Sequence, residues 1–136
     1  MRMWVHSLHT GGKSIPPAVK ARTERRILDY AAKNYAGKFT RIEVRFRGAL
    51  CYIDAYTEPE ELGSYGPPAG KLREEWLQEL RDHPHHLCRI RYFGNEDRWS
   101  VAFYTYAHEK YEPSFLLSGA DQGTPEEAFA TSALFL

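Results

Sequence analysis

Cysteine is scarce in this sequence: its 136 residues include two, which is too few for a disulfide scaffold. No apolar run approaches the roughly 18 residues of a transmembrane helix, so we expect no membrane contact. The first residues, MRMWVHSLHTGGKS, lack the apolar core of a secretion signal. Repeats and low-complexity segments are also absent. These absences predict a cytoplasmic protein with reduced thiols, and no pattern indicates a cofactor or a metal.

The composition is that of an ordinary globular domain. Hydrophobic residues make up 43% of the chain, charged residues 26% and aromatic residues 14%, close to the averages for globular proteins. A chain of this length buries about two-thirds of its unfolded surface and needs no metal or disulfide to fold. We expect residues 15–136 to form a single domain and residues 1–14 to be a flexible N-terminal segment or an edge strand.

The net charge is zero, but the two signs are unevenly distributed along the chain. Residues 1–50 hold 11 Lys or Arg against 3 Asp or Glu, whereas residues 51–136 hold 7 against 15. Such an asymmetry is typical of a basic surface for an anionic partner. It also arises when the two halves pair within the fold. We favour this second interpretation because mixed signs keep a domain soluble.

Apolar spacing predicts three helices. Segment 15–37 starts with two prolines, which suit the first turn of a helix, and its apolar residues share one face. Segment 71–84 carries a shorter apolar stripe and ends at a proline. Segment 123–136 begins with Thr124, a proline and Glu127 at the spacing of a capping box.

A change to period two between residues 39 and 56 predicts a hairpin. A two-residue turn at Arg47-Gly48 places Val44 opposite Cys51 on an apolar face. The same register places Arg41 opposite Asp54 on the other face. A slip of one residue would destroy both faces, so the pattern specifies which side of the sheet each residue occupies.

A second hairpin is predicted over residues 85–106, turning at residues 94–97. Its register pairs Tyr92 with Trp99 and places Cys88 opposite Phe103 on the core face. We expect one more strand over residues 114–119, after a proline. The fold class is therefore α+β: an antiparallel sheet of about five strands with three helices, in the order α-β-β-α-β-β-β-α.

Three motifs look chemical but fit structural roles better. GGKS at residues 11–14 lacks the first glycine and the parallel sheet that a phosphate-binding loop needs. HPHHLC at residues 83–88 has zinc-ligand residue types, yet strand alternation separates its two adjacent histidines. Cys51 and Cys88 both fall on predicted core faces, so we expect buried, unreactive thiols.

The hairpin registers gather arginine and tyrosine on the outer face of the sheet. Guanidinium groups bind phosphate and stack on aromatic rings, and exposed rings on a sheet hold single-stranded nucleic acid. The residues expected to contact a ligand or partner there are Arg41, Arg45, Tyr52, Arg89, Arg91, Tyr104 and Tyr106. A basic face of the first helix adds Arg22, Arg25, Arg26 and Lys33.

The sequence leaves the occupant of this face open. A nucleic acid, a protein partner or a second copy of the chain would each suit arginine and tyrosine. The face could also be a solvated surface stabilised by cross-strand pairs such as Arg41–Asp54. The leading hypothesis is a non-enzymatic binding or regulatory module.

The alternative hypothesis is a small hydrolase acting on phosphoesters. Its candidate acid and base groups are Asp54, His108 and Glu109. A general acid and base must converge in one cleft, and the sequence shows no such convergence. No catalytic residue is therefore assigned.

Several stretches together resemble a family of small bacterial proteins that carries no assigned activity. They are RTERRILDYA, RFRGALCYIDAY, RYFGNEDRWSVAFYTYAHEKYEPSF and GTPEEAF, and the resemblance runs from about residue 11 to residue 136. It implies a bacterial cytoplasmic protein and supplies no ligand or site residue. The closing strand and GTPEEAF helix are also similar to the tail of HicB-type antitoxin domains, over a short and generic stretch.

Overall fold

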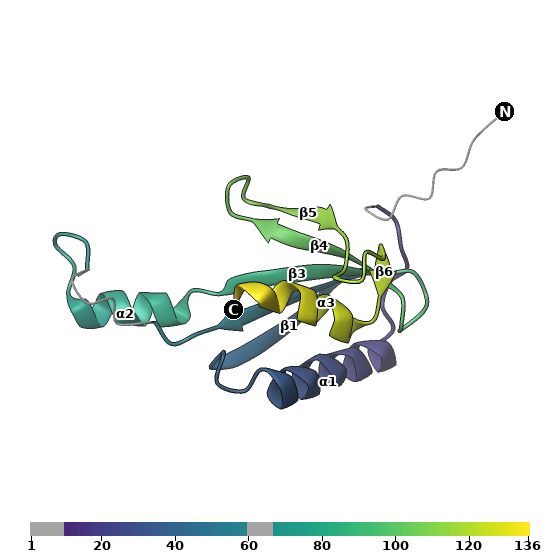
Figure 1. Ribbon diagram of the computed structural model, residues 1–136, viewed down its shortest axis with the longest axis horizontal. Coiled ribbons are helices and arrows are strands. Elements are labelled where there is room, and N and C mark those ends of the chain that lie inside the picture. Colours follow the sequence, from purple (N-terminus) through teal and green to yellow (C-terminus); the bar gives the residue numbers. More distant parts are fainter. Residues whose placement is uncertain (1–9, 60–66) are drawn as a thin grey trace.

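The computed structural model describes residues 10–59 and 67–136. Its six-stranded sheet is antiparallel, with the order β1-β2-β3-β4-β5 and with β6 paired to β4 (Figure 1). The α+β class and the element order predicted from the sequence are confirmed. The elements are α1 (Pro17–Asn34), β1 (Arg41–Arg47), β2 (Leu50–Tyr56), α2 (Arg73–Asp82), β3 (His85–Tyr92), β4 (Trp99–Thr105), β5 (Lys110–Ser114), β6 (Gln122–Gly123), α3 (Pro125–Ser132) and the short 3-10 turn Ala133–Phe135.

The first hairpin has the predicted faces but a different turn. Arg47 pairs with Leu50, so the turn is Gly48-Ala49 and not Arg47-Gly48. Gly48 has a φ of +58°, and primed hairpin turns favour glycine at this first central position. The shift changes partners by two residues, which leaves every side chain on its predicted side.

The second hairpin is confirmed residue by residue. Tyr92 pairs with Trp99 and Cys88 pairs with Phe103, as the sequence predicts. The pairing of β3 with β2 contains an irregularity that alternation alone does not reveal. His86 pairs with Asp54 and Cys88 pairs with the preceding residue of β2, so Leu87 is the extra residue of a β-bulge.

The strand expected over residues 114–119 is wrong in position. The strand is Lys110–Ser114, which follows β4 after a four-residue turn. Glu109 closes this turn with a φ of +52°, and β5 begins at the next residue. Residues beyond Ser114 form a second turn, in which the Gly119 N–H donates to the Leu116 carbonyl at 2.8 Å.

Helices α1 and α3 cover one face of the sheet. They pack on each other, and α1 also contacts β1 while α3 contacts β3 and β4. The buried residues of α1 recur every four positions, which gives one stripe along the helix: Val19, Thr23, Ile27 and Ala31. The capping box that begins α3 is present as predicted, with Thr124 and Glu127 each accepting from the other's backbone N–H.

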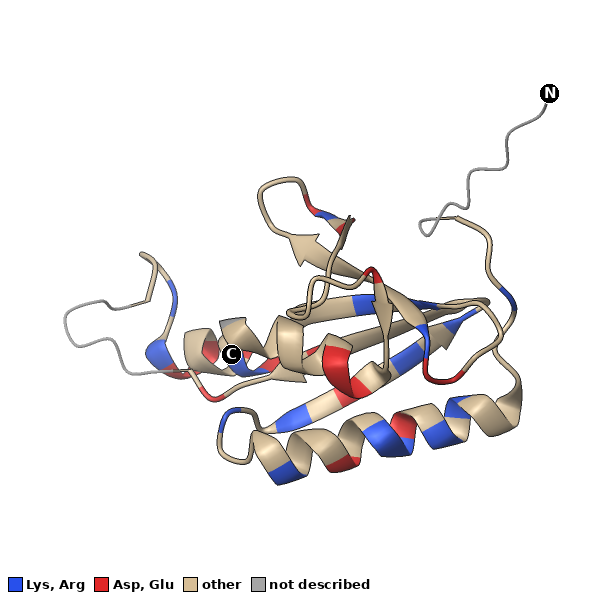
Figure 2. Ribbon diagram, turned by 45° about the vertical axis from the view of Figure 1, so that its right-hand side comes forward, with Lys and Arg blue, Asp and Glu red and all other residues tan. Residues whose placement is uncertain are grey.

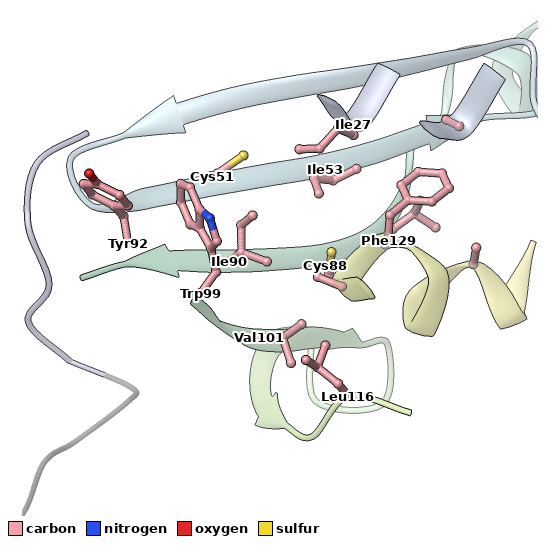
Figure 3. Close-up of a cluster of buried hydrophobic side chains, with 14 of the residues drawn as sticks. Ile27, Cys51, Ile53, Cys88, Ile90, Tyr92, Trp99, Val101, Leu116 and Phe129 are labelled. Atoms are coloured by element: carbon pink, nitrogen blue, oxygen red, sulfur yellow. The ribbon is translucent and has the colours of Figure 1, made fainter. Parts of the chain in front are cut away.

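The core lies between these helices and the sheet. Figure 3 shows Ile27 of α1, Phe129 of α3 and Ile53 and Ile90 of the sheet meeting in this layer, and all four are fully buried. Cys51 and Cys88 are also fully buried and unpaired, in agreement with the sequence prediction. Burial raises the pKa of both thiols, and that of Cys88 reaches about 12.

Helix α2 forms as predicted but does not join the core. None of its residues is buried, and the predicted apolar stripe includes Leu72 at 68% exposure and Leu80 at 37%. Figure 1 shows α2 projecting beyond one end of the sheet. The predicted helix is therefore confirmed, but its apolar side does not pack on the sheet as the sides of α1 and α3 do.

The expected N-terminal edge strand at MWVHS falls within residues 1–9, outside the described part of the chain. Residues 10–14 form no strand, but they are attached to the end of β3. The Lys13 N–H donates to the Tyr92 carbonyl at 2.9 Å, and Arg91 donates to the Gly11 carbonyl at 2.9 Å. The GGKS motif therefore has a structural role in docking this segment.

Candidate functional site

We call the sheet surface opposite α1 and α3 the open face. Arg45 on β1, Tyr52 on β2, Arg89 on β3 and Tyr104 on β4 alternate with core residues and reach this face. Each strand contributes polar or aromatic side chains here because its apolar residues point to the helices. The pattern predicted from the two hairpins therefore exists in three dimensions.

Aromatic rings from strands that are not neighbours meet on the open face. Neighbouring strands are about 4.8 Å apart, so β2 and β5 would be about 14 Å apart in a flat sheet. The ring centroids of Tyr52 on β2 and Tyr111 on β5 are nevertheless only 5.5 Å apart. Ala102 of β4, a small residue on the same face, lies buried between them in strand order. The two tyrosine side chains therefore lean towards each other, and both line one hollow on this face.

Aromatic rings and guanidinium groups form one continuous cluster on this face. Tyr111 contacts Tyr104 at 5.2 Å between ring centroids and Tyr52 at 5.5 Å. The guanidinium of Arg45 lies 5.2 Å from the Tyr52 ring, and that of Arg89 lies 5.2 Å from the Tyr111 ring. These cation–π contacts hold both guanidinium groups on the open face. Arg45 is also ion-paired with Asp54 at 2.9 Å and with Glu43 at 3.6 Å.

A buried carboxylate lies at the centre of the open face. The side chain of Asp54 is 3% exposed, and its Oδ2 accepts a hydrogen bond from Arg45 at 2.9 Å. Its Oδ1 lies 2.8 Å from Nδ1 of His86. The predicted pair of Arg41 with Asp54 is wrong, because the different hairpin turn moves Arg41 opposite Tyr56, where it stacks at 3.8 Å.

Two hollows flank His86. One, of about 500 Å³, is lined by Arg45, Tyr52, His86 and Tyr111 among others. The other, of about 290 Å³, lies beside Tyr104 and also borders His86. The His86 side chain is 26% exposed, and its ring lies 4.7 Å from that of Tyr104. A ligand in either hollow would meet this imidazole.

The hydroxyl of Tyr111 is buried and has no hydrogen-bond partner among the described residues. Burial, with the nearby Asp54 carboxylate as a second cause, raises the pKa of Tyr111 above its ordinary value. An unpartnered buried hydroxyl is unusual in a folded protein. It therefore marks this side of the larger hollow as a place where a ligand atom could accept a hydrogen bond.

The other predicted residues of the face lie at its margins. Arg91 is tied to the N-terminal segment through the Gly11 carbonyl. Tyr106 was expected on the strand, but β4 ends at Thr105 and Tyr106 lies in the following turn. Its hydroxyl accepts from the His86 backbone N–H at 3.1 Å, so it still borders the cluster.

The basic face of α1 is largely neutralised by other parts of the chain. Arg22 makes a two-bond contact with Glu96, at 2.9 and 3.0 Å. Arg26 pairs with Glu126 at 2.8 Å and with Asp97 at 2.9 Å. Figure 2 shows these acidic segments beside the basic helix. For these two arginines the two halves of the chain do pair.

The remaining basic residues of that helix, Arg25 and Lys33, are exposed. Neither has an ion pair or side-chain hydrogen bond within residues 10–59 and 67–136. With Arg22 and Arg26 engaged by carboxylates, α1 presents isolated charges and no hollow. The open face is the stronger candidate site.

The predicted acid–base set does not assemble. Asp54 binds Arg45 and His86, whereas His108 in the β4–β5 turn bonds to Glu112. The partner of Asp54 is thus His86, which the sequence pattern indicates only as a residue type that could bind zinc. Within the described residues, no group of three or more His, Cys, Asp or Glu side chains is arranged to hold a metal ion.

A wider hollow of about 700 Å³ lies beneath α2, next to Trp76 and Phe39. One of its walls is a helix that buries none of its own residues. His85 borders it and bonds to Thr57 at 3.1 Å. It lacks the combination of arginines, rings and an unpartnered buried hydroxyl that the open face has.

Comparison of the chain with protein-family models, curated proteins and solved structures finds no match. The resemblance to small bacterial proteins therefore stays a prediction. No helix in the described part of the chain is long and apolar enough to cross a membrane. The open face is therefore the feature from which a function can be inferred.

Proposed function

We propose that this protein is a cytoplasmic module that binds single-stranded nucleic acid on its open face. The observation that carries the proposal is the gathering of arginines and tyrosines around a hollow of about 500 Å³ on the sheet surface. Tyrosine rings offer faces on which bases stack, and guanidinium groups bind the phosphates between them. The unpaired thiols Cys51 and Cys88 support a reducing compartment.

The charge on the open face supports an anionic partner. Five arginines and two carboxylates alternate onto it from β1, β2 and β3, a surplus of three positive charges: Arg41, Arg45, Arg47, Arg89 and Arg91 against Glu43 and Asp54. The zero net charge of the whole chain hides this local surplus. A surplus of one sign in a concavity attracts the opposite charge more strongly than the same charges on a convex surface.

The shape of the face favours a single strand over a duplex. Bases inside a duplex are stacked on each other and cannot stack on protein rings. A flexible single strand can turn its bases into the hollow beside Tyr52 and Tyr111. Stacking on an aromatic side chain contributes about 1–3 kcal/mol per base and is tolerant of sequence.

Fluorescence anisotropy with labelled 12-nucleotide RNA, single-stranded DNA and duplex DNA tests the proposal. We expect both single strands to bind more tightly than the duplex, with affinity falling steeply as salt rises. The double variant Arg47→Ala with Arg89→Ala removes two phosphate contacts. It should reduce the salt slope by about 1.4, because each contact with a single strand contributes about 0.7.

A matched control removes two positive charges from the other side of the molecule. Arg22→Ala with Arg25→Ala changes α1 and leaves the open face intact. An equal loss of affinity in both double variants would mean that binding depends on overall charge, which contradicts the proposal. No binding of any single strand at low salt would also contradict it and would favour a protein partner for this face.

A further inference from the structure

The burial of Asp54 requires an explanation beyond stability. Its side chain is 3% exposed, and its two oxygens bind Arg45 at 2.9 Å and His86 at 2.8 Å. Replacement of such buried ionic groups by apolar residues is often neutral or stabilising. The cluster is better explained by what the carboxylate does to the imidazole of His86.

The carboxylate fixes the orientation and the tautomer of His86. An ionised carboxylate only accepts hydrogen bonds, so Nδ1 must carry the hydrogen that lies between them. In the neutral ring, Nε2 then carries the free lone pair and can accept a proton. The same arrangement orients the histidine of many acid–base sites.

Two further groups around the larger hollow complement this base. The buried, unpartnered hydroxyl belongs to Tyr111, whose ring centroid lies 6.2 Å from that of His86. The guanidinium of Arg45 borders the same hollow and is half exposed. A proton acceptor, a proton donor and a cation therefore surround one space large enough for a phosphate and its ribose.

We propose that the open face cleaves RNA, with His86 as the general base and Asp54 as its positioning residue. Nε2 of His86 takes the proton of a ribose 2′-hydroxyl, and the 2′-oxygen forms a bond to the adjacent phosphorus. The bond from phosphorus to the 5′-oxygen breaks, and that oxygen takes a proton from the Tyr111 hydroxyl. The products are a 2′,3′-cyclic phosphate and a free 5′-hydroxyl. Proton exchange with water then restores His86 and Tyr111.

This inference rests on the proposed function, because the strand must first bind to the open face. Cleavage would also distinguish RNA from DNA, whereas binding alone would not. DNA has no 2′-hydroxyl and is bound but not cut. The guanidinium of Arg45 offsets the negative charge that grows on the phosphoryl oxygens during the step.

The test incubates 5′-labelled 12-nucleotide RNA with the protein in EDTA and separates the products on a denaturing gel. His86→Ala should lower the cleavage rate by about 100-fold or more, the usual contribution of a general base. Its affinity for the RNA, measured by anisotropy, should fall far less than the cleavage rate, because the arginines and rings of the open face remain. His83→Ala removes an exposed imidazole at the end of α2 and should change neither quantity. If His86→Ala fails to fold, His86→Gln takes its place.

Asp54→Asn tests the positioning role with a readout that a merely structural residue would not change. Nitrogen chemical shifts of ¹⁵N-labelled histidine report the tautomer of His86. We expect hydrogen on Nδ1 in the native protein and on Nε2 in the variant, because an asparagine amide can donate to Nδ1. Cleavage should then fall while RNA binding persists. An unchanged tautomer would contradict the role given to Asp54.

The possible results separate the two proposals. Binding of RNA without cleavage overturns the catalytic inference and leaves the binding function standing. Cleavage that persists in His86→Ala also overturns it, because the base would then be elsewhere or in a contaminating nuclease. Absence of binding to any single strand removes both proposals together.

Discussion

Replacement of Tyr111 by phenylalanine should make the protein more stable. The hydroxyl is buried without a partner, and a buried unsatisfied group costs about 1–3 kcal/mol. Phenylalanine keeps the ring contacts with Tyr52 and Tyr104 at 5.5 and 5.2 Å. Removal of the hydroxyl therefore relieves a cost and loses little packing.

The expected gain can be converted into a melting temperature. Unfolding entropy of about 2.1 cal/mol/K per residue gives about 0.29 kcal/mol/K for a chain of this length. A gain of about 1–3 kcal/mol then raises the Tm by about 3–10 °C. Thermal unfolding followed by near-ultraviolet circular dichroism measures this shift, and urea unfolding gives an independent free energy.

Tyr106→Phe is the matched control, because it removes a hydroxyl that does have a partner. That hydroxyl accepts from the His86 N–H at 3.1 Å, and the residue is 55% exposed. We expect no gain from this change, or a loss of up to about 1 kcal/mol. If Tyr111→Phe lowers the Tm instead, the hydroxyl of Tyr111 has a partner and its assignment as the free proton donor is refuted.

The same residue gives a prediction for alkaline pH. Burial raises the pKa of Tyr111, so the folded state keeps a proton that the unfolded state releases above about pH 10. The stability linked to this group is therefore present below about pH 10 and is lost as the pH rises further. Tyr111→Phe should make the alkaline fall in stability shallower than in the native protein.

Three further predictions follow from particular contacts. Gly12→Ala should lower the Tm by several degrees and speed hydrogen exchange nearby, since its new Cβ would stand 2.6 Å from the Tyr92 carbonyl oxygen and φ is +91°. Cys51 and Cys88 should resist a disulfide reagent at pH 8 and both react in urea, because burial suppresses their thiolates in the folded state. Arg26→Ala should cost about 1 kcal/mol, and the loss should shrink at 1 M salt because its ion pairs are partly exposed.

The two hairpins show why faces are easier to predict than partners. The second hairpin could be predicted completely because its aromatic pair, Tyr92 and Trp99, sits next to a loop rich in turn residues. In the first hairpin, turns at Arg47-Gly48 and at Gly48-Ala49 both fit the apolar alternation. The two turns shift each residue's pairing partner by two positions, which leaves every side chain on the same face. The observed register separates them: Arg47 pairs with Leu50, so Gly48, with its positive φ, occupies the first turn position. The candidate arginines therefore lie on the predicted side but have different neighbours.

Helix α2 shows a second limit on what the sequence predicts. Its amphipathic pattern predicts that one side avoids water, but the pattern contains no information about what covers that side. Trp76 borders a hollow with residues of the α1–β1 loop, and Leu72 stays exposed. Tertiary contacts between distant segments decided this outcome.

The β-bulge at Leu87 explains why the centre of the site could not be predicted. Strict alternation counted back from Cys88 puts His86 on the core side of β3. The extra residue reverses this, so His86 reaches the open face and pairs with Asp54. The position of Tyr111 on the open face could not be predicted for a related reason, because β5 begins four residues before the predicted strand. Bulges and strand ends change the face on which a single side chain lies without changing the hydrophobic pattern around it. The arginines and tyrosines of the proposed binding surface follow that pattern, whereas the proposed base and proton donor depend on its two local exceptions.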